Sequence, residues 1–238
     1  MAHHHLYAIG NALVDTEYEV TDTLLERMGV SKRHMTLIDA EQRSALLAHV
    51  QGLPARRTGG GSAGNTVVAL AQLGGRGFYS CRVADDELGA FYTQDLQAHG
   101  VATNLSHTRP AAGQTGSCMV LVTPDAERTM CTFLGATSQL DRQALHPHDI
   151  AKSRIYYMEG YLAASPTGLE AAVEGRQLAV QHGVPTALTL SDVSMINFCR
   201  AGLEAMAGDG LDYLFARWQP LLRPGEEKDL ALFLLRWS

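Results

Sequence analysis

A glycine-rich stretch that runs straight into a helix is the part of the sequence best suited to bind a small molecule. It reads Gly59-Gly60-Gly61-Ser62-Ala63-Gly64-Asn65 and precedes apolar residues at helical spacing. Glycines let a ligand approach the backbone, the start of a helix offers free N–H groups, and Asn65 can both donate and accept hydrogen bonds, which suits a polyol. A plain glycine turn before a helix has the same spacing, however, and the stretch matches neither of the phosphate-binding motifs GxxxxGK[ST] and GxGxxG.

Three charged residues could act in a binding site, and each also has an ordinary structural explanation. Asp15 follows an apolar run and could accept two hydrogen bonds from neighbouring hydroxyls, or it could belong to a turn. Arg128 could balance the charge of a phosphate, or pair at the surface with the acids beside it. Asp192 follows another apolar run, where open α/β sheets place functional side chains, but it could equally cap the next helix. The pattern leaves both interpretations of each residue open.

Strand and helix patterns alternate along most of the chain, which predicts an α/β fold with helices on both faces of a mainly parallel sheet. The runs typical of buried strands are Leu6 to Val14, Gly77 to Val83, Ile155 to Glu159, Val184 to Leu190 and Leu211 to Phe215. Helices are predicted to begin around Asp39, Asn65, Asp86 and Ser165, and another passes through Phe198 to Met206. We expect one large domain over residues 6–238.

A second, smaller sheet is predicted where this alternation is interrupted. Ser117 to Val122 and Thr129 to Leu134 are short apolar runs separated by the turn formers Pro124 and Asp125, which is typical of a β-hairpin. Thr16 to Val20 alternates polar and apolar residues, as a strand with one wet face does. We expect these strands to pair outside the main core, in insertions at about residues 16–38 and 115–134.

Composition argues against several classes of function. The net charge of −6 offers no basic surface for nucleic acid. The apolar runs are shorter than the roughly 18 residues that cross a membrane, and no apolar leader opens the chain, so a cytoplasmic protein is expected. The four cysteines form no CxxC pair and are predicted to be reduced thiols that pack in the interior. Residues 1–5 look like part of an expression tag, and we expect no metal site there.

Six segments, in family order, resemble the ribokinase or PfkB carbohydrate kinase family, and within it the branch that contains adenosine kinases. They are GNALVD (10–15), GGGSAGNTVVALAQLG (59–74), VADDELG (83–89), TGSCMVLVTPDAERTM (115–130), EGYLAASP (159–166) and TLSDVSMINFCRAG (189–202). The resemblance implies a ribokinase-like fold, in which a small β-sheet closes as a lid over a sugar.

The resemblance also implies a role for individual residues. Asp15, Gly61 and Asn65 match positions that hold sugar hydroxyls, with Gly60 beside them. Asn11 matches a position near the base or sugar, Leu134 and Tyr161 match walls of the pocket, and Arg128 matches an arginine that balances the charge of the transferring phosphate. The implied reaction is transfer of the γ-phosphoryl group of ATP, with Mg²⁺, to a hydroxyl of a sugar or nucleoside.

Two departures from the family pattern bear on activity. Arg217-Trp218-Gln219-Pro220 stands where the family has an Asn-x-x-Glu element, and the chain stops at Ser238, before the family's Gly-Ala-Gly-Asp segment with its aspartate base. The similar Ala207-Gly208-Asp209-Gly210 precedes a strand, and is predicted to be a turn. We therefore expect this chain to hold an acceptor site but no ATP site. A monomer or a homodimer is expected. A binding module without catalytic activity and a fragment without function of its own are the alternatives.

Overall fold

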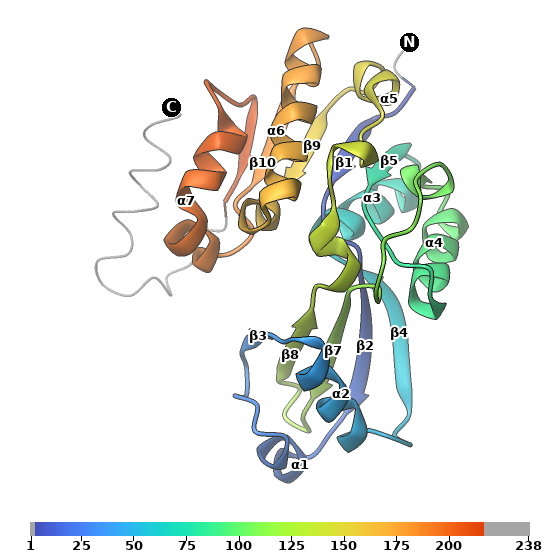
Figure 1. Cartoon of the computed structure of the whole chain (residues 1–238), viewed down its shortest axis with the longest axis vertical. Helices are drawn as coiled ribbons and strands as arrows, with labels where there is room; N and C mark the ends of the chain where they lie inside the picture. Colours follow the sequence, from blue (N-terminus) through green and yellow to red (C-terminus); the bar gives the residue numbers. More distant parts are fainter. Residues whose placement is uncertain (1–2, 217–238) are drawn as a thin grey trace.

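A computed structural model of the chain describes residues 3–216, apart from the side chains of residues 193 and 194, and shows two sheets joined end to end (Figure 1). The larger sheet has six parallel strands in the order β11-β10-β9-β1-β5-β6. Their bounds are β1 Leu6–Ile9, β5 Gly77–Ser80, β6 Ala102–Thr103, β9 Tyr156–Glu159, β10 Thr186–Thr189 and β11 Tyr213–Phe215. The predicted parallel α/β sheet is confirmed.

Helices cover both faces of this sheet. Successive residues of β1 point to opposite sides, and they belong to two separate cores. Tyr7 and Ile9 belong to a core with α5 (Pro147–Ala151), α6 (Pro166–Gln181) and α7 (Val193–Ala207). Leu6 and Ala8 belong to the opposite core, with α3 (Ser62–Gln72) and α4 (Glu87–Ala98). Short 3₁₀ turns connect the elements: η1 Asn104–Ser106, η2 Gly135–Gln139, η3 Arg142–Ala144 and η4 Gly160–Ala164.

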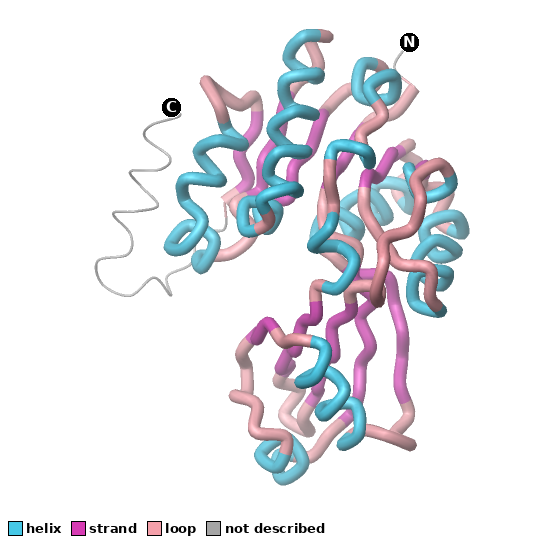
Figure 2. Tube along the Cα trace, viewed as in Figure 1, coloured by secondary structure: helices cyan, strands magenta, loops and turns pink. Residues whose placement is uncertain are grey.

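The smaller sheet, with its two helices, forms a separate layer that we call the lid (Figure 2). Its strands are ordered β3-β8-β7-β2-β4, and its helices are α1 (Asp22–Arg27) and α2 (Ala40–His49). The strand bounds are β2 Leu13–Glu19, β3 Met35–Leu37, β4 Ala55–Gly60, β7 Ser117–Val122 and β8 Arg128–Phe133. The predicted hairpin is β7 and β8, and it pairs with β2 through a parallel β2–β7 ladder, as expected.

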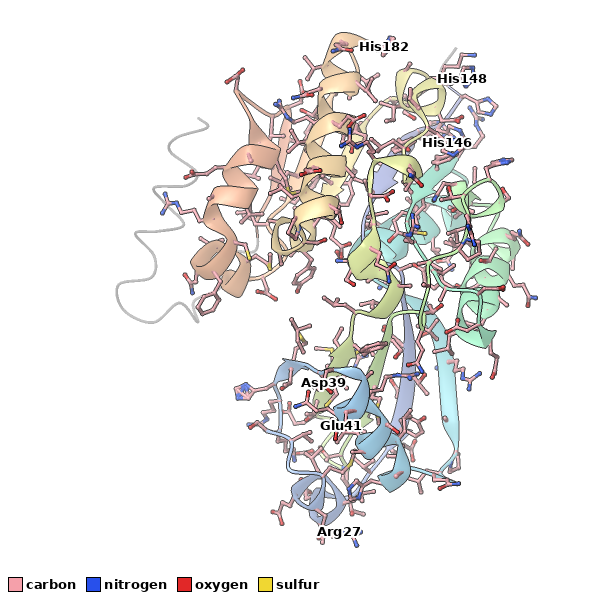
Figure 3. The ribbon with its side chains drawn as sticks, viewed as in Figure 1. Arg27, Asp39, Glu41, His146, His148 and His182 are labelled. Carbon is pink, nitrogen blue, oxygen red and sulfur yellow. The ribbon has the colours of Figure 1, made fainter. Side chains whose placement is uncertain are left out.

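One face of the lid sheet packs on its helices. Met119, Leu121 and Cys131 of this face form a core with Leu25 of α1 and Leu46 of α2. Helix α2 begins with a capping box, in which the Asp39 carboxylate accepts from the backbone N–H of Gln42, and the Gln42 side chain accepts from that of Asp39. Figure 3 labels Asp39 at the start of this helix. The other face of the sheet, which carries Asp15, is left open by these helices.

The strand predicted over Leu6 to Val14 is in fact two strands in different sheets. Strand β1 ends at Ile9, residues 10–12 carry the chain from one sheet to the other, and β2 begins at Leu13. Asp15 therefore lies inside a lid strand and does not follow a strand of the large sheet. Apolar residues stand on both sides of Gly10 and Asn11, so hydrophobicity alone does not mark the crossing.

Two further boundaries differ from the prediction. Gly59 and Gly60 are the last residues of β4, and the helix begins at Ser62 rather than at Asn65. Strand β4 is an edge strand of the lid, so the first lid segment extends to Gly60, beyond the expected limit near residue 38. Glycine is a poor strand former, but Gly59 and Gly60 extend β4 because their backbone pairs with β2.

Two histidines near the start of the chain, His4 and His5, contact the large domain, whereas His3 is exposed. His4 is buried, and its Nε2 lies 3.1 Å from the Asp149 carboxylate. The Nδ1 of His5 accepts a hydrogen bond from the backbone of Arg76. Figure 3 shows His146 and His148 in this same end of the molecule, far from the lid.

The cysteines agree with the sequence analysis. All four are free thiols; Cys81, Cys118 and Cys131 are buried, and Cys199 is half-buried. Within residues 3–216, no helix combines the length and the apolar character required to cross a bilayer.

Candidate functional site

The candidate site lies where the chain passes between the two sheets. Four segments make this passage: residues 10–12 after β1, Gly61 after β4, the residues before β7, and those after β8. Because the strands of the large sheet are parallel, the loops after β1 and β9 meet at the same edge, where open α/β sheets bind ligands.

The Asp15 carboxylate lies directly against Gly60. The two residues are on neighbouring strands, with Asp15 paired to Thr58 in the β2–β4 ladder. A Cβ atom at Gly60 would come within 2.5 to 2.6 Å of all three carboxyl atoms of Asp15. Only glycine therefore leaves room for the carboxylate at this point, and the sequence could not reveal that the two residues touch.

Gly61 brings the start of α3 against Asn11. Its φ of +86° is one that side-chain-bearing residues rarely adopt, and a Cβ there would overlap the Asn11 carbonyl oxygen. Asn11 is itself buried, its carbonyl accepts from the Tyr79 hydroxyl at 3.0 Å, and its side-chain oxygen accepts from Thr137 at 3.2 Å. Asn11, Asp15, Gly60 and Gly61 are thus brought together as one group.

Glu159 holds this group in place, and the sequence analysis did not single it out. Its carboxylate is fully buried at the end of β9 and accepts from the Asn11 N–H at 2.5 Å, from the Ser62 hydroxyl at 2.6 Å and from the Ser62 N–H at 3.3 Å. Burial raises the pKa of Glu159, while these hydrogen bonds oppose the rise. The acid therefore ties the loop after β1 to the first turn of α3.

Replacing Glu159 with glutamine is expected to lower the free energy of unfolding by about 1 to 3 kcal/mol, because a glutamine amide would turn a donor toward the N–H of Asn11 or Ser62. Denaturant unfolding measures this change. Glu170→Gln, on the exposed face of α6, is a matched control that should leave stability within about 0.5 kcal/mol. Equal stability of the two variants would contradict the structural role of Glu159.

Asn65 is exposed on α3, one turn after Gly61, and its N–H bonds the Gly61 carbonyl at 2.9 Å. Its side chain lines a cavity of about 300 Å³ between β4, α3 and α4. Gly60 lines the same cavity, together with Thr58, Tyr92, Asp95 and His99 among others. Two of the predicted site residues, Gly60 and Asn65, therefore line one cavity, and Gly60 is also the residue that the Asp15 carboxylate contacts.

Arg128 acts on Asp15 through charge across the open face of the lid. The residue begins β8, is exposed, and is four residues from Thr132, which belongs to the same cross-strand row as Cys118 and Asp15. Burial raises the pKa of Asp15 to about 6, and the positive charge of Arg128 partly offsets this rise. Asp15 and Arg128 thus lie on the same face of the lid sheet, with Arg128 toward the end of the ladder that is farther from the glycines.

Leu134 and Tyr161 are both half-buried and lie on different turns. Leu134 follows β8 and precedes η2. Tyr161 lies in η4 after β9, and its hydroxyl donates a 2.6 Å hydrogen bond to Asp192. Asp192 also accepts from the Met195 N–H at 3.4 Å, so it caps α7 and holds Tyr161 at once. The capping role expected for Asp192 is therefore observed, and a functional role for this residue stays a prediction.

The fold and the site together define a two-sheet α/β protein of the ribokinase-like type. Its lid carries the Asp15 carboxylate against Gly60 of the neighbouring strand β4. The family model "pfkB family carbohydrate kinase" matches residues 34–217. The chain belongs to this family.

Relatives and solved structures agree with this assignment. The chain is 27% identical over 189 residues to a guanosine-inosine kinase of Escherichia coli strain K12, covering 76% of the chain and 44% of the relative. It is 27% identical over 195 residues to an adenosine kinase of Saccharomyces cerevisiae, covering 78% and 56%. It is also similar to the structures of an adenosine kinase from Sinorhizobium meliloti (TM-score 0.84, 34% identity, 99% of this chain and 73% of that one) and a probable sugar kinase from Rhizobium etli (0.85, 34%, 100% and 72%).

The chain spans about half the length of these curated relatives. The departures noted at Arg217 to Pro220 and at Ser238 lie outside the residues that the structure describes. The residues after α7 do form the predicted turn, since Gly208 has a φ of +60° and Gly210 bonds back to Ala207 before β11. They open no helix.

Proposed function

We propose that this protein is an ATP-dependent kinase that phosphorylates a hydroxyl of a nucleoside or sugar. The observation that carries the proposal is the contact of the Asp15 carboxylate with Gly60, beside Asn65. The names of the relatives and structural neighbours, which include purine nucleoside kinases and a sugar kinase, support this class of acceptor.

The group can bind a sugar through its hydroxyls. An ionised carboxylate is an acceptor only, so Asp15 can take the protons of two neighbouring hydroxyls, while the amide of Asn65 can donate and accept. The bare backbone of Gly60 and Gly61 lets the ring approach closely. Glu159 keeps the Gly61 turn and Asn11 in register while the acceptor is bound.

Arg128 would serve the transferring phosphoryl group through its charge, since such reactions depend on positioning and electrostatic stabilisation. ATP would supply that group. Residues 3–216 contain no group of three His, Cys, Asp or Glu side chains arranged to hold a metal ion. Localisation in the cytoplasm and a monomeric or homodimeric state remain predictions.

Incubation of the protein with Mg-ATP and a panel of adenosine, guanosine, inosine, ribose and fructose tests the proposal. We expect equal amounts of ADP and a phosphorylated acceptor from at least one nucleoside or sugar, and no product with Arg128→Ala. Hydrolysis of ATP independent of every acceptor would contradict the proposal. Binding of an acceptor without turnover would favour the alternative of a binding module.

Acceptor binding is expected to weaken as the pH falls through about 6, the pKa to which burial raises Asp15 against the charge of Arg128. Below that value the carboxylate gains a proton and loses acceptor capacity, so the Kd should rise by up to about tenfold per pH unit. Calorimetric titration with adenosine at several pH values measures the effect. Asp15→Asn should abolish this dependence; a pH profile that persists in the variant would assign it to another group.

A further inference from the structure

The segment that leads into the lid strand β7 is held to the large domain by Thr115. This residue is fully buried and is tied to the loop after β5 by three hydrogen bonds. The Thr115 N–H and hydroxyl donate to the two oxygens of the Asp86 carboxylate at 2.8 and 2.6 Å, and the Ala84 N–H donates to the Thr115 hydroxyl at 3.0 Å. Asp86 also caps α4, so Thr115 is fixed to the large domain.

Gly116 is the point at which the chain passes from this anchor into the lid. A Cβ there would come within 2.6 Å of the Leu134 carbonyl oxygen and 2.9 Å of the Ala12 carbonyl oxygen, so three of the four crossing segments meet at this glycine. Its own carbonyl accepts from the Val14 N–H at 3.0 Å, at the start of the β2–β7 ladder. Because glycine has more backbone freedom than other residues, the orientation of the lid can change at Gly116 unless another contact spans it.

Arg43 of the lid helix α2 makes a contact that spans Gly116. Its half-buried guanidinium donates to the Ser117 hydroxyl at 2.9 Å, on the lid side of the glycine, and to the Gln114 side-chain oxygen at 3.0 Å, on the large-domain side. The guanidinium carbon also lies 5.5 Å from the centre of the Phe133 ring, in a cation–π contact at the end of β8. The planar fork of an arginine can hold two acceptors at once, so one lid side chain bonds both sides of the glycine.

The charge of Arg43 is attracted by Asp86, the residue that anchors Thr115. Burial lowers the pKa of Arg43, and the negative charge of Asp86 opposes this shift. Since Asp86 caps α4 of the large domain and Arg43 belongs to α2 of the lid, the attraction draws the two parts of the molecule together. The contacts of Arg43 are therefore placed to hold the lid in one orientation.

We propose that Arg43 is a positioning residue of the candidate acceptor site, because it bonds both sides of Gly116 and so fixes the angle between the lid and the large domain. Asp15 belongs to the lid, whereas Asn65 belongs to α3 of the large domain. A fixed angle keeps these two polar groups at the spacing that an acceptor needs. The effect on binding rests on the proposed function, whereas the effect on the angle depends on no ligand.

Two measurements on the same variants test the proposal. Electron paramagnetic resonance between spin labels at Glu26→Cys on α1 and Glu170→Cys on α6, in a Cys199→Ser background, gives the distance between the lid and the large domain without ligand. Glu26 and Glu170 are exposed, and the other native cysteines are buried. Calorimetric titration with adenosine, guanosine and inosine gives the affinity.

Gln114→Ala removes only the bond that crosses Gly116. We expect this variant to broaden the distance distribution and to raise the Kd for the bound nucleoside about threefold to tenfold, the scale of one hydrogen bond. Arg43→Ala should have at least this effect, and adding Gln114→Ala to it should cause no further loss, because the two residues act as one contact. Ser117→Ala breaks a bond inside the lid, so it should keep the wild-type distance and affinity even where it lowers stability.

The matched control is Gln143→Ala, which removes another exposed glutamine side chain, in η3, and should change neither measurement. Wild-type distances in Arg43→Ala, or equal effects of Gln114→Ala and Ser117→Ala, would overturn the proposal. Thermal melting shows whether each variant is folded, and the exposed Gln114 keeps the test valid if Arg43→Ala is not. If no nucleoside binds wild-type protein while Arg43→Ala and Gln114→Ala still broaden the distances, the proposed function fails and the role of Arg43 in fixing the lid stands.

Discussion

Replacing Asp15 with alanine is expected to weaken acceptor binding by about 1 to 3 kcal/mol, a five- to 150-fold rise in the Kd for adenosine. The carboxylate lies against Gly60 on the open face of the lid and is the group best placed to accept hydroxyl protons there. Without it, the hydroxyls of a bound sugar would be left without partners in a partly buried site. Calorimetric titration of wild-type and variant protein with adenosine measures the loss.

Replacing Asp15 is expected to affect the stability of the fold and the affinity for the acceptor differently. Because the folded state raises the pKa of Asp15, the ionised group opposes folding above about pH 6, and that cost disappears below its unfolded value. Asp15→Asn should therefore keep or raise the melting temperature at pH 7 while its affinity for the acceptor falls. Asp125→Ala removes a lid carboxylate that pairs with Lys32 at the far hairpin turn, and should bind normally. Equal loss of binding in both variants would remove Asp15 from the site.

Replacing Gly61 with alanine is expected to lower the free energy of unfolding by about 2 to 4 kcal/mol. The φ of +86° is unfavourable for alanine, and the added Cβ would also overlap the Asn11 carbonyl. Since Asn11 is held by Glu159 and Tyr79, the clash can be relieved only by moving the loop that precedes β2. Denaturant unfolding gives the stability, and adenosine affinity should fall with it.

Gly74, at the other end of the same helix, separates backbone strain from the clash. Its φ of +83° is nearly that of Gly61, but a Cβ there would meet no atom within 4 Å. Gly74→Ala should therefore cost only the conformational term, about 1 to 2 kcal/mol. If the two alanine variants lose the same stability, the close approach of Gly61 to Asn11 does not explain the need for glycine at position 61.

Local signals in the sequence predict much of the fold. Asp39 and Gln42 stand three residues apart before an apolar helix, and they form the capping box that this spacing predicts. The turn around Pro124 and Asp125 separates β7 from β8 as expected. These features depend on residues close in the chain, so propensity and spacing are sufficient to find them.

The parts that the sequence could not reveal depend on contacts between distant residues. Glu159 closes an apolar strand and looks like an ordinary polar terminus, yet it binds Asn11, 148 residues earlier. The passage from β1 to β2 lies at Gly10 and Asn11, with apolar residues before and after it, so hydrophobicity alone does not separate the two strands. The partnership of Asp192 with Tyr161 was likewise invisible, although each residue stood out alone. Tertiary pairing, rather than local preference, decides these features.

The measurement that tests the central claim most directly is a thermal-shift screen of wild-type protein and Asp15→Asn against adenosine, guanosine, inosine, ribose and fructose. If the group around Asp15 and Gly60 binds the acceptor, at least one compound should raise the melting temperature of the wild-type protein, and the same compound should raise that of Asp15→Asn by clearly less. Equal stabilisation of both proteins by that compound would contradict the assignment of the acceptor site to the open face of the lid.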